Sequence, residues 1–239
     1  MNLQCQFIEA TSIDDAHFKL TRRIFQKGRI YVIDRGSYEG HKRLEYDFVT
    51  LHIKYPGTRP LAPTMPLGVP PVTSDEDIEK YFIKYLLDPT LAKNELYTYS
   101  QYIAPQLQPV IDMLRDQGAG TNQATMSIGN EESINQEHPA CLRLIDCRVM
   151  YGKLHFIIYF RSWDLMCGMP ENLGGLQLLK EYIAAEIGVE DGEMVCSSKG
   201  LHLYDYQWPI AKARLNNLLP EDCVLSEEEV DLGEGWIGK

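Results

Sequence analysis

Two β-rich stretches separated by only two residues place the strongest constraint on how this chain folds. Residues 142–150 (LRLIDCRVM) and 153–160 (KLHFIIYF) are rich in β-branched, aromatic and other apolar residues. The pair between them, Tyr151 and Gly152, is typical of the two-residue turn of a β-hairpin. The sequence therefore predicts an antiparallel hairpin in this part of the chain.

The turn also determines which residues meet at the open end of the hairpin. It pairs Met150 with Lys153, and counting back along both strands from that pair places Cys141 opposite Ser162, next to Arg161. A bulge would shift the pairing by a residue or two but would leave the thiol and the guanidinium at the same end. We therefore expect Cys141 and Arg161 to lie close together.

A thiol beside a guanidinium has a chemical use. The positive charge favours the thiolate and lowers the pKa of a cysteine from about 8.5 toward neutrality, which makes Cys141 a candidate nucleophile. Arg161 and the Ser162 hydroxyl together can bind phosphate oxygens. The alternative is that Cys141 is a small core residue and Arg161 forms a structural ion pair with Asp164.

Hydrophobic periodicity and end signals predict four helices elsewhere in the chain. They cover residues 11–28, 74–88, 105–118 and 172–187. The last carries a continuous apolar stripe and stops at Gly188, so we expect it to be the central buried helix.

The remaining N-terminal segments are predicted to be strands and loops. Residues 29–40 form a short strand followed by a glycine-containing loop that presents Arg35, and residues 43–56 form a long β-rich segment. Six of the thirteen prolines lie between Pro56 and Thr73. That density excludes a helix or a strand interior and predicts an ordered surface loop, which is either a connector or a lid.

The composition excludes several classes of protein. A net charge of −11 argues against a nucleic-acid-binding surface, so an anionic ligand must be held by a few placed cations. No apolar run approaches the roughly 20 residues of a membrane span, and the first residues do not resemble a signal peptide, so we expect a cytoplasmic protein. The six cysteines contain no C-x-x-C pair, which favours reduced thiols and no metal site.

A later segment, GLHLYDY, supplies two polar groups to one face of a strand. Its alternation puts His202 and Tyr204 on one side and Leu201 and Leu203 on the other. Two such groups can bind a hydroxyl-bearing ligand such as a ribose. A purely structural His-x-Tyr is the alternative.

Together these motifs resemble the thymidylate synthase family, and its compact archaeal-type branch most closely. The matching segments are PAC, RSWDLMCGMPEN, LQLLKEYIAAEIG and HLY, in this order from Cys141 to Tyr204. The resemblance implies an α+β fold with a large mixed β-sheet and a long central buried helix, in a single catalytic domain over residues 1–239. It also implies a homodimer that uses the large sheet as its interface.

The family resemblance implies a transfer reaction on the base of a pyrimidine nucleotide. Cys141 would add to C6 of dUMP, and C5 would then attack the methylene group of a reduced folate or pterin, giving dTMP. Asn172 would bind the uracil N3–H and O4, and Asp164 would contribute to the pyrimidine site. Tyr99 and Glu79 match, more weakly, the residues that organise proton transfer; for Glu79 the alternative is a solvated helix residue.

The same resemblance implies how the rest of the nucleotide is bound. Arg161 and Ser162 would bind the 5′-phosphate, with Arg35 as a second phosphate ligand. His202 and Tyr204 would hold the 3′-hydroxyl.

The chain departs from the family pattern in its phosphate ligands. The arginine pair that usually reaches the phosphate of the partner subunit aligns with Asn122 and Gln123. One side of the phosphate site is therefore neutral or supplied from elsewhere, with Lys42 and Arg43 as candidates.

Further departures concern the residues around the nucleophile and the one-carbon carrier. Leu142 replaces the histidine that usually follows the nucleophile, and Phe160 replaces the glutamine that usually precedes the arginine. The tryptophan-bearing segment that packs the folate is missing, because residues 86–99 contain no tryptophan. Both 5,10-methylene-tetrahydrofolate and a methanopterin-type analogue therefore suit the chemistry.

Two other functions remain open at this point. A pyrimidine nucleotide 5-hydroxymethylase shares the cysteine addition but ends with water in place of hydride. A non-catalytic paralogue that only binds pyrimidine nucleotides needs the arginine but has no use for the cysteine.

Overall fold

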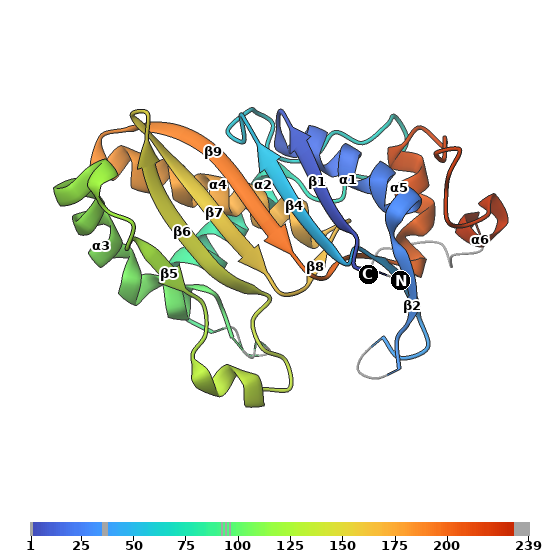
Figure 1. The fold of residues 1–239 in the computed structure, drawn as a ribbon, viewed down its shortest axis with the longest axis horizontal. Helices are drawn as coiled ribbons and strands as arrows, with labels where there is room; N and C mark the ends of the chain where they lie inside the picture. The colour runs from blue at the N-terminus through green and yellow to red at the C-terminus, as the bar shows by residue number, and fades with distance from the viewer. Residues whose placement is uncertain (1, 35–37, 92, 94, 96, 232–239) are drawn as a thin grey trace.

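The predicted hairpin lies within a six-stranded sheet in the computed structural model, which describes residues 2–34, 38–91, 93, 95 and 97–231 (Figure 1). Its strands are β6 (Leu142–Met150) and β7 (Lys153–Phe160). Tyr151 and Gly152 both have positive φ, 54° and 75°, as a type I′ turn requires. The hairpin prediction is confirmed, with the same bounds.

The register of the hairpin shifts by one residue at its open end. Met150 pairs with Lys153 as predicted, but an irregularity between Leu142 and Leu144 makes Leu142 the partner of Phe160. As a result the backbone N–H of Arg161 donates to the carbonyl oxygen of Cys141 at 2.9 Å. The expected pairing of Cys141 with Ser162 is therefore wrong by one residue, because a bulge places an extra residue on one strand.

The large sheet is mixed, as expected. Its remaining strands are β1 (Cys5–Ala10), β4 (Phe48–Ile53), β5 (Thr125–Ser127) and β9 (Glu190–Ser198). The order is β1-β4-β9-β7-β6-β5. The β1–β4 and β7–β9 pairs are parallel and the others are antiparallel, so the α+β fold with a large mixed sheet is confirmed.

A second, four-stranded sheet lies beside the first. It contains β2 (Arg29–Val32), β3 (Lys42–Glu45), β8 (Trp163–Asp164) and β10 (Leu201–Tyr204), in the order β2-β3-β10-β8. The predicted β-rich segment 43–56 is thus divided between two sheets, since β3 belongs to the small sheet and β4 to the large one. Strand β8 follows the hairpin directly and leads into the longest helix.

The long helix predicted to be central is α4 (Gly168–Ile187). Leu173, Leu176, Leu179 and Ile183 are fully buried, and Gly188 closes the helix with φ 74°. The helix packs against three other helices and two strands of the large sheet. It begins four residues earlier than predicted, and its role as the buried central helix is confirmed.

The other helices are α1 (Ile13–Lys27), α2 (Asp75–Tyr81), α3 (Ser100–Gln117), α5 (Trp208–Arg214) and α6 (Glu227–Asp231). The sequence predicts α1, α2 and α3, with differences at two ends, but it does not predict α5 and α6. Helix α2 continues as a π-helical segment, Phe82–Leu87, and α3 begins at Ser100 rather than at Pro105. Residues 56–73 contain no helix or strand, in agreement with the predicted loop.

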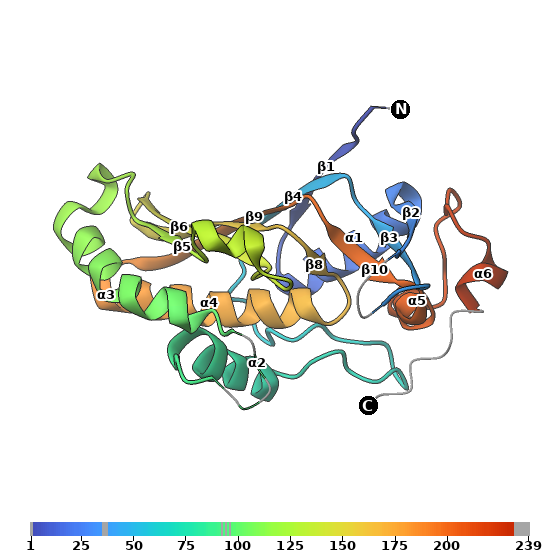
Figure 2. The ribbon, with the colours of Figure 1, turned by 90° about the horizontal axis from the view of Figure 1, so that it is seen from below.

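One side of the large sheet carries no helix among the described residues. Figure 2 shows α2 and α4 on one side of this sheet, with the opposite side uncovered. Phe7 on β1 and Ile157 on β7 are 65% and 37% exposed. No helix within the described residues is long and apolar enough to cross a membrane.

Candidate active site

Cys141 and Arg161 meet at the open end of the hairpin, as predicted. The Nε of Arg161 donates to the carbonyl oxygen of Ala140 at 3.1 Å, and its Nη2 donates to the carbonyl oxygen of Pro139. The guanidinium therefore holds the segment that leads into the half-buried Cys141. These two bonds use two of its five N–H groups, which leaves the others for an anion.

The predicted alternative, an ion pair between Arg161 and Asp164, is not formed among the described residues. The Asp164 carboxylate accepts hydrogen bonds from the Met166 backbone at 2.9 Å and from Gln207 Nε2 at 3.2 Å. Asp164 is thus engaged with the start of α4 and with the segment after β10. The charge of Arg161 is therefore not neutralised by Asp164 and can act on the space beside Cys141.

The pKa of Cys141 differs from the sequence-based expectation. Burial raises the pKa of the thiol, and Arg161 together with a hydrogen bond from Tyr97 offsets this only in part. The expected lowering of the pKa toward neutrality is therefore wrong for the free protein. The sequence shows that a cation is near but does not show how deeply the sulfur is buried.

Two tyrosines from the segment before α3 surround the cysteine. The Tyr99 hydroxyl accepts from the Leu142 backbone N–H at 3.4 Å and is almost completely buried. Tyr97 lies beside Tyr99, with ring centroids 5.8 Å apart, and contacts Cys141. Sequence reasoning identified Tyr99 but missed Tyr97, although the spacing of two in "YTY" puts both rings on one side of an extended segment.

Asn172 lies in the first turns of α4 and is bonded at both ends of its amide. Its Oδ1 accepts from Trp163 Nε1 at 2.9 Å, and its Nδ2 donates to the Tyr81 hydroxyl at 2.9 Å. A Cβ placed on Gly168 would lie 3.4 Å from the Asp164 Cβ and 3.9 Å from Asn172 Oδ1. Asp164 and Asn172 therefore face the same small space across Gly168.

His202 and Tyr204 lie together on β10, as the alternation predicts. The pairing of β10 with its neighbours puts His202 beside Asp164 and Tyr204 beside Arg43. The two rings are 4.7 Å apart in an edge-to-face arrangement.

The electrostatics of this pair favour a neutral imidazole. Burial lowers the pKa of His202, so the ring is uncharged at neutral pH. Its Nδ1 lies 2.8 Å from the Gly200 carbonyl oxygen and must be the protonated nitrogen, because a carbonyl only accepts. That leaves Nε2 as an acceptor. Burial also raises the pKa of Tyr204 to about 12, which keeps its hydroxyl a donor.

Some predicted residues are not brought into this group. Glu79 is exposed on α2, while its neighbours Ile78 and Tyr81 face α4. Asn122 and Gln123 are exposed just before β5. Arg35 lies outside the described residues.

Of the two candidate substitutes for the missing phosphate ligands, only Arg43 is near His202. Its charge lowers the pKa of both His202 and Tyr204 as a secondary effect, although its Nη2 also pairs with Glu45 at 2.7 Å. The Lys42 backbone N–H donates to Asp205.

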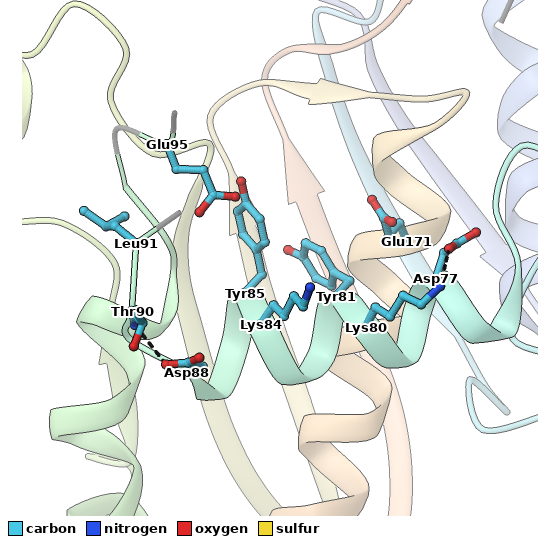
Figure 3. A pocket seen from close by; sticks show the side chains of 10 residues that line it. All are labelled: Asp77, Lys80, Tyr81, Lys84, Tyr85, Asp88, Thr90, Leu91, Glu95 and Glu171. Carbon is cyan, nitrogen blue, oxygen red and sulfur yellow. Dashed lines mark hydrogen bonds and ion pairs between the residues drawn. The ribbon is translucent and has the colours of Figure 1, made fainter. Parts of the chain in front are cut away.

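A pocket of about 450 Å³ is lined by Glu171, the residue before Asn172 on α4, and by Tyr81, whose hydroxyl accepts from the Asn172 amide. Figure 3 shows Tyr81 and Tyr85 projecting from the same helical segment, with Glu171 of α4 beside them. The two rings stack with centroids 5.3 Å apart and an angle of 11°. Burial raises the pKa of Glu171, and the nearby Asp77 adds to this effect.

Sequence reasoning missed this aromatic wall. The available signal was the spacing of four between Tyr81 and Tyr85, which puts both rings on one face of the predicted helix. The wall is an aromatic surface close to residues 86–99, a segment that contains no tryptophan.

Comparison with known proteins gives archaeal relatives that match over nearly their whole length. A protein of Methanosarcina acetivorans described as "Putative thymidylate synthase" is 27% identical over 215 residues, which is 87% of this chain and 93% of that protein. A protein of Methanothermobacter marburgensis with the same description is 26% identical over 224 residues, 88% of this chain and 98% of that protein. The thymidylate synthase of Listeria monocytogenes is 33% identical over 112 residues, 46% of this chain and 35% of that protein.

A solved structure and a family-wide sequence comparison agree with these relatives. The thermostable thymidylate synthase A from Bacillus subtilis matches with a TM-score of 0.63 at 14% identity, over 86% of this chain and 84% of that one, which is a likeness of fold. The sequence model of the family described as thymidylate synthase matches residues 88–226. Because that match covers more than half of the chain, this protein belongs to the thymidylate synthase family.

Proposed function

We propose that this chain is a thymidylate synthase that transfers a one-carbon unit to C5 of dUMP through a covalent adduct at Cys141, giving dTMP. Family membership supports a methyltransferase-type enzyme. The observation that carries the finer proposal is the Cys141 thiol beside the Arg161 guanidinium, whose remaining N–H groups face no carboxylate among the described residues. Binding alone needs only the cation, whereas addition to C6 needs the sulfur.

The surrounding residues suit each part of the nucleotide. Arg161 and Ser162 bind the 5′-phosphate, joined by Arg35 and, from within the same subunit, Arg43. His202 Nε2 accepts from the 3′-hydroxyl and Tyr204 donates to it.

The base and the proton transfers involve a second set of residues. Asn172 and Asp164 hold the base on the α4 side. Tyr97 and Tyr99 lie beside the sulfur, where a hydroxyl can exchange protons with bound water. Glu79 is exposed, so we give it no direct contact with the nucleotide.

The reaction consumes a methylene-carrying reduced folate or methanopterin-type carrier as second substrate. This carrier supplies the methylene group and the hydride that reduces it to methyl. The pocket walled by Tyr81 and Tyr85 fits a flat ring system, because stacked aromatic faces bind such rings well. Tyr81 both lines this pocket and bonds Asn172, which supports transfer onto a base held by Asn172.

Two further features belong to this proposal. We propose that residues 1–239 act as one catalytic domain and that two copies pair through the helix-free face of the large sheet. Phe7 and Ile157 are exposed apolar residues on that face, which also carries the Thr50–Ser197 and His52–Glu193 pairs, and pairing would cover them.

Turnover of C5-tritiated dUMP tests the proposal directly. We expect tritium release in the presence of methylene-tetrahydrofolate or its methanopterin counterpart, none without a carrier, and a product with the mass of dTMP. Release with a product heavier by one oxygen would instead identify a hydroxymethylase. No release with either carrier, despite dUMP binding, would leave the non-catalytic paralogue as the better description.

Replacing Arg161 by alanine is expected to weaken dUMP binding far more than deoxyuridine binding. The variant loses a charge-assisted contact to phosphate, worth about 1.5–3 kcal/mol, which corresponds to roughly 10- to 100-fold in affinity. Titration calorimetry with both ligands measures the difference. Equal losses for both would mean that the main task of Arg161 is to hold Pro139 and Ala140 in place.

A further inference from the structure

We propose that Trp163 is a specificity-determining positioning residue, whose indole N–H fixes the orientation of the Asn172 amide so that the site accepts uracil and disfavours cytosine. This inference rests on the proposed function, in which Asn172 contacts the base. It concerns a residue that contacts no part of the nucleotide and acts only through its neighbour.

Any asparagine amide can take two orientations. They exchange the carbonyl oxygen and the NH2 group, and therefore exchange an acceptor for a donor. The indole Nε1–H of Trp163 only donates, so at 2.9 Å its partner must be the Asn172 oxygen. The Tyr81 hydroxyl at 2.9 Å from Nδ2 can either accept or donate, so it adapts to either orientation. Of these two partners, only Trp163 determines which orientation the Asn172 amide takes.

Among the described residues, this orientation leaves one bonding position free at each end of the amide. Asn172 Oδ1 has a second lone pair and Nδ2 has a second hydrogen. Uracil presents an N3–H donor and an O4 acceptor, which complement these two positions. Cytosine presents an N3 acceptor and a 4-amino donor, the reverse pattern. Cytosine would require the flipped amide, which would turn the NH2 group of Asn172 toward the buried N–H of Trp163.

The indole itself is held rigidly. Trp163 is 3% exposed, and its ring stacks on Phe160 with centroids 4.2 Å apart and an angle of 5°. Its backbone N–H donates to the Gly200 carbonyl oxygen at 2.9 Å within the small sheet. Phe160 stands where the family pattern has glutamine, so this departure has a physical use here: it supplies the flat surface that orients the indole.

The opposite side of the amide is held as well. A Cβ on Gly175 would lie 2.4 Å from Tyr81 Cδ1, so the tyrosine ring packs directly on the backbone of α4. Tyr81 is also stacked on Tyr85. The hydroxyl of Tyr81 therefore stays within reach of Asn172 whichever way its own proton points.

The test is Trp163→Phe, which keeps an aromatic ring on Phe160 and removes the N–H. The dissociation constants of dUMP and dCMP are measured by titration calorimetry for both proteins. We expect wild type to prefer dUMP and the variant to lose at least tenfold in the ratio of the two constants, with weaker dUMP and tighter dCMP binding. A variant that keeps the wild-type ratio would overturn the inference.

Trp208→Phe is the matched control. Trp208 is also 3% exposed and donates its indole N–H to a protein acceptor, the Leu203 carbonyl oxygen at 3.3 Å. The Trp208→Phe variant should lose about as much stability as Trp163→Phe. The ratio of its dissociation constants for dUMP and dCMP should equal that of wild type. If it moves the ratio as far as Trp163→Phe does, the effect is general to the fold and the inference fails.

Tyr81→Phe keeps the inference testable even if Trp163→Phe does not fold. Because the Trp163 bond remains, the preference for dUMP should persist within about threefold of wild type. Loss of that preference would show that Tyr81, and not Trp163, orients the amide. If wild type itself releases no tritium from dUMP, the proposed function fails separately from this inference.

Discussion

Replacing Cys141 by alanine is expected to lower the turnover of dUMP by roughly a thousandfold or more, because covalent catalysis has no substitute for its nucleophile. Nucleotide affinity should change little, since Arg161 and the residues of β10 remain in place. Tritium release measures the first quantity and titration calorimetry the second. Substantial release by a clean preparation of the variant would remove Cys141 from its proposed role.

The pH dependence of the wild-type protein gives a second readout for the same residue. Burial raises the pKa of the Cys141 thiol, so in the free protein it is mostly protonated at neutral pH. Alkylation by iodoacetamide requires the thiolate, so its rate should rise as the pH increases through the neutral and mildly alkaline range. A rate that is already maximal at neutral pH would contradict a raised pKa of the Cys141 thiol.

Two other cysteines serve as controls for the substitution. Cys147 is almost completely buried in β6, and Cys223 is half-buried near Glu229 of α6. Replacing Cys147 by alanine should at most lower the stability of the fold and should not lower turnover by the folded protein. Replacing Cys223 by alanine should leave turnover unchanged. Loss of turnover in either variant would point to a general effect of thiol removal.

Replacing Asn172 by aspartate is expected to exchange the preferred base from uracil to cytosine. The carboxylate can accept from both the Trp163 N–H and the Tyr81 hydroxyl, so the variant should remain folded with the side chain in the same place. The ionised aspartate has no donor for O4 of uracil and repels it, whereas it accepts from the 4-amino group of cytosine and, when protonated, donates to cytosine N3.

Each mismatched contact costs about 1–3 kcal/mol, or roughly one to two decades in selectivity. We therefore expect loss of dUMP turnover and measurable activity on dCMP, read from competition between the two nucleotides. Asn135→Asp makes the same change of charge at an exposed site on another element and should leave the competition unaltered. If Asn172→Asp keeps its dUMP preference, Asn172 does not contact the base and the assigned substrate is in doubt.

The features that the sequence predicts well are those that short segments determine. Tyr151 and Gly152 are enough to specify the turn, and with it the register over most of the hairpin. The apolar stripe from Leu176 to Ile187 and the stop at Gly188 likewise identify α4 without knowledge of its neighbours. In each case the information lies within a few residues of the feature.

The features that the sequence misses depend on neighbours that are distant along the chain. The pKa of Cys141 is raised because the folded chain buries the thiol, and neither Arg161 nor the hydrogen bond from Tyr97, which comes from another segment, fully offsets that burial. Glu79 matches a family pattern by position, but Ile78 and Tyr81 pack on α4 and turn Glu79 toward solvent. The bulge beside Leu142 moves the partner of Cys141 by one residue, and no local signal marks it.

The close contact between α2 and α4 has a consequence for how mutations in this protein would be interpreted. Gly174 and Gly175 allow Ile78 and Tyr81 to touch the backbone of α4, and a Cβ at either glycine would come within 2.7 Å or less of those side chains. A larger residue at Gly175 would push Tyr81 away from Asn172 and deform the wall of the pocket, and one at Gly174 would displace Ile78 and with it the packing of α2 on α4. In a saturation mutagenesis screen scored by growth, these two glycines would tolerate as few substitutions as the nucleophile does, although neither has a side chain that could take part in the chemistry.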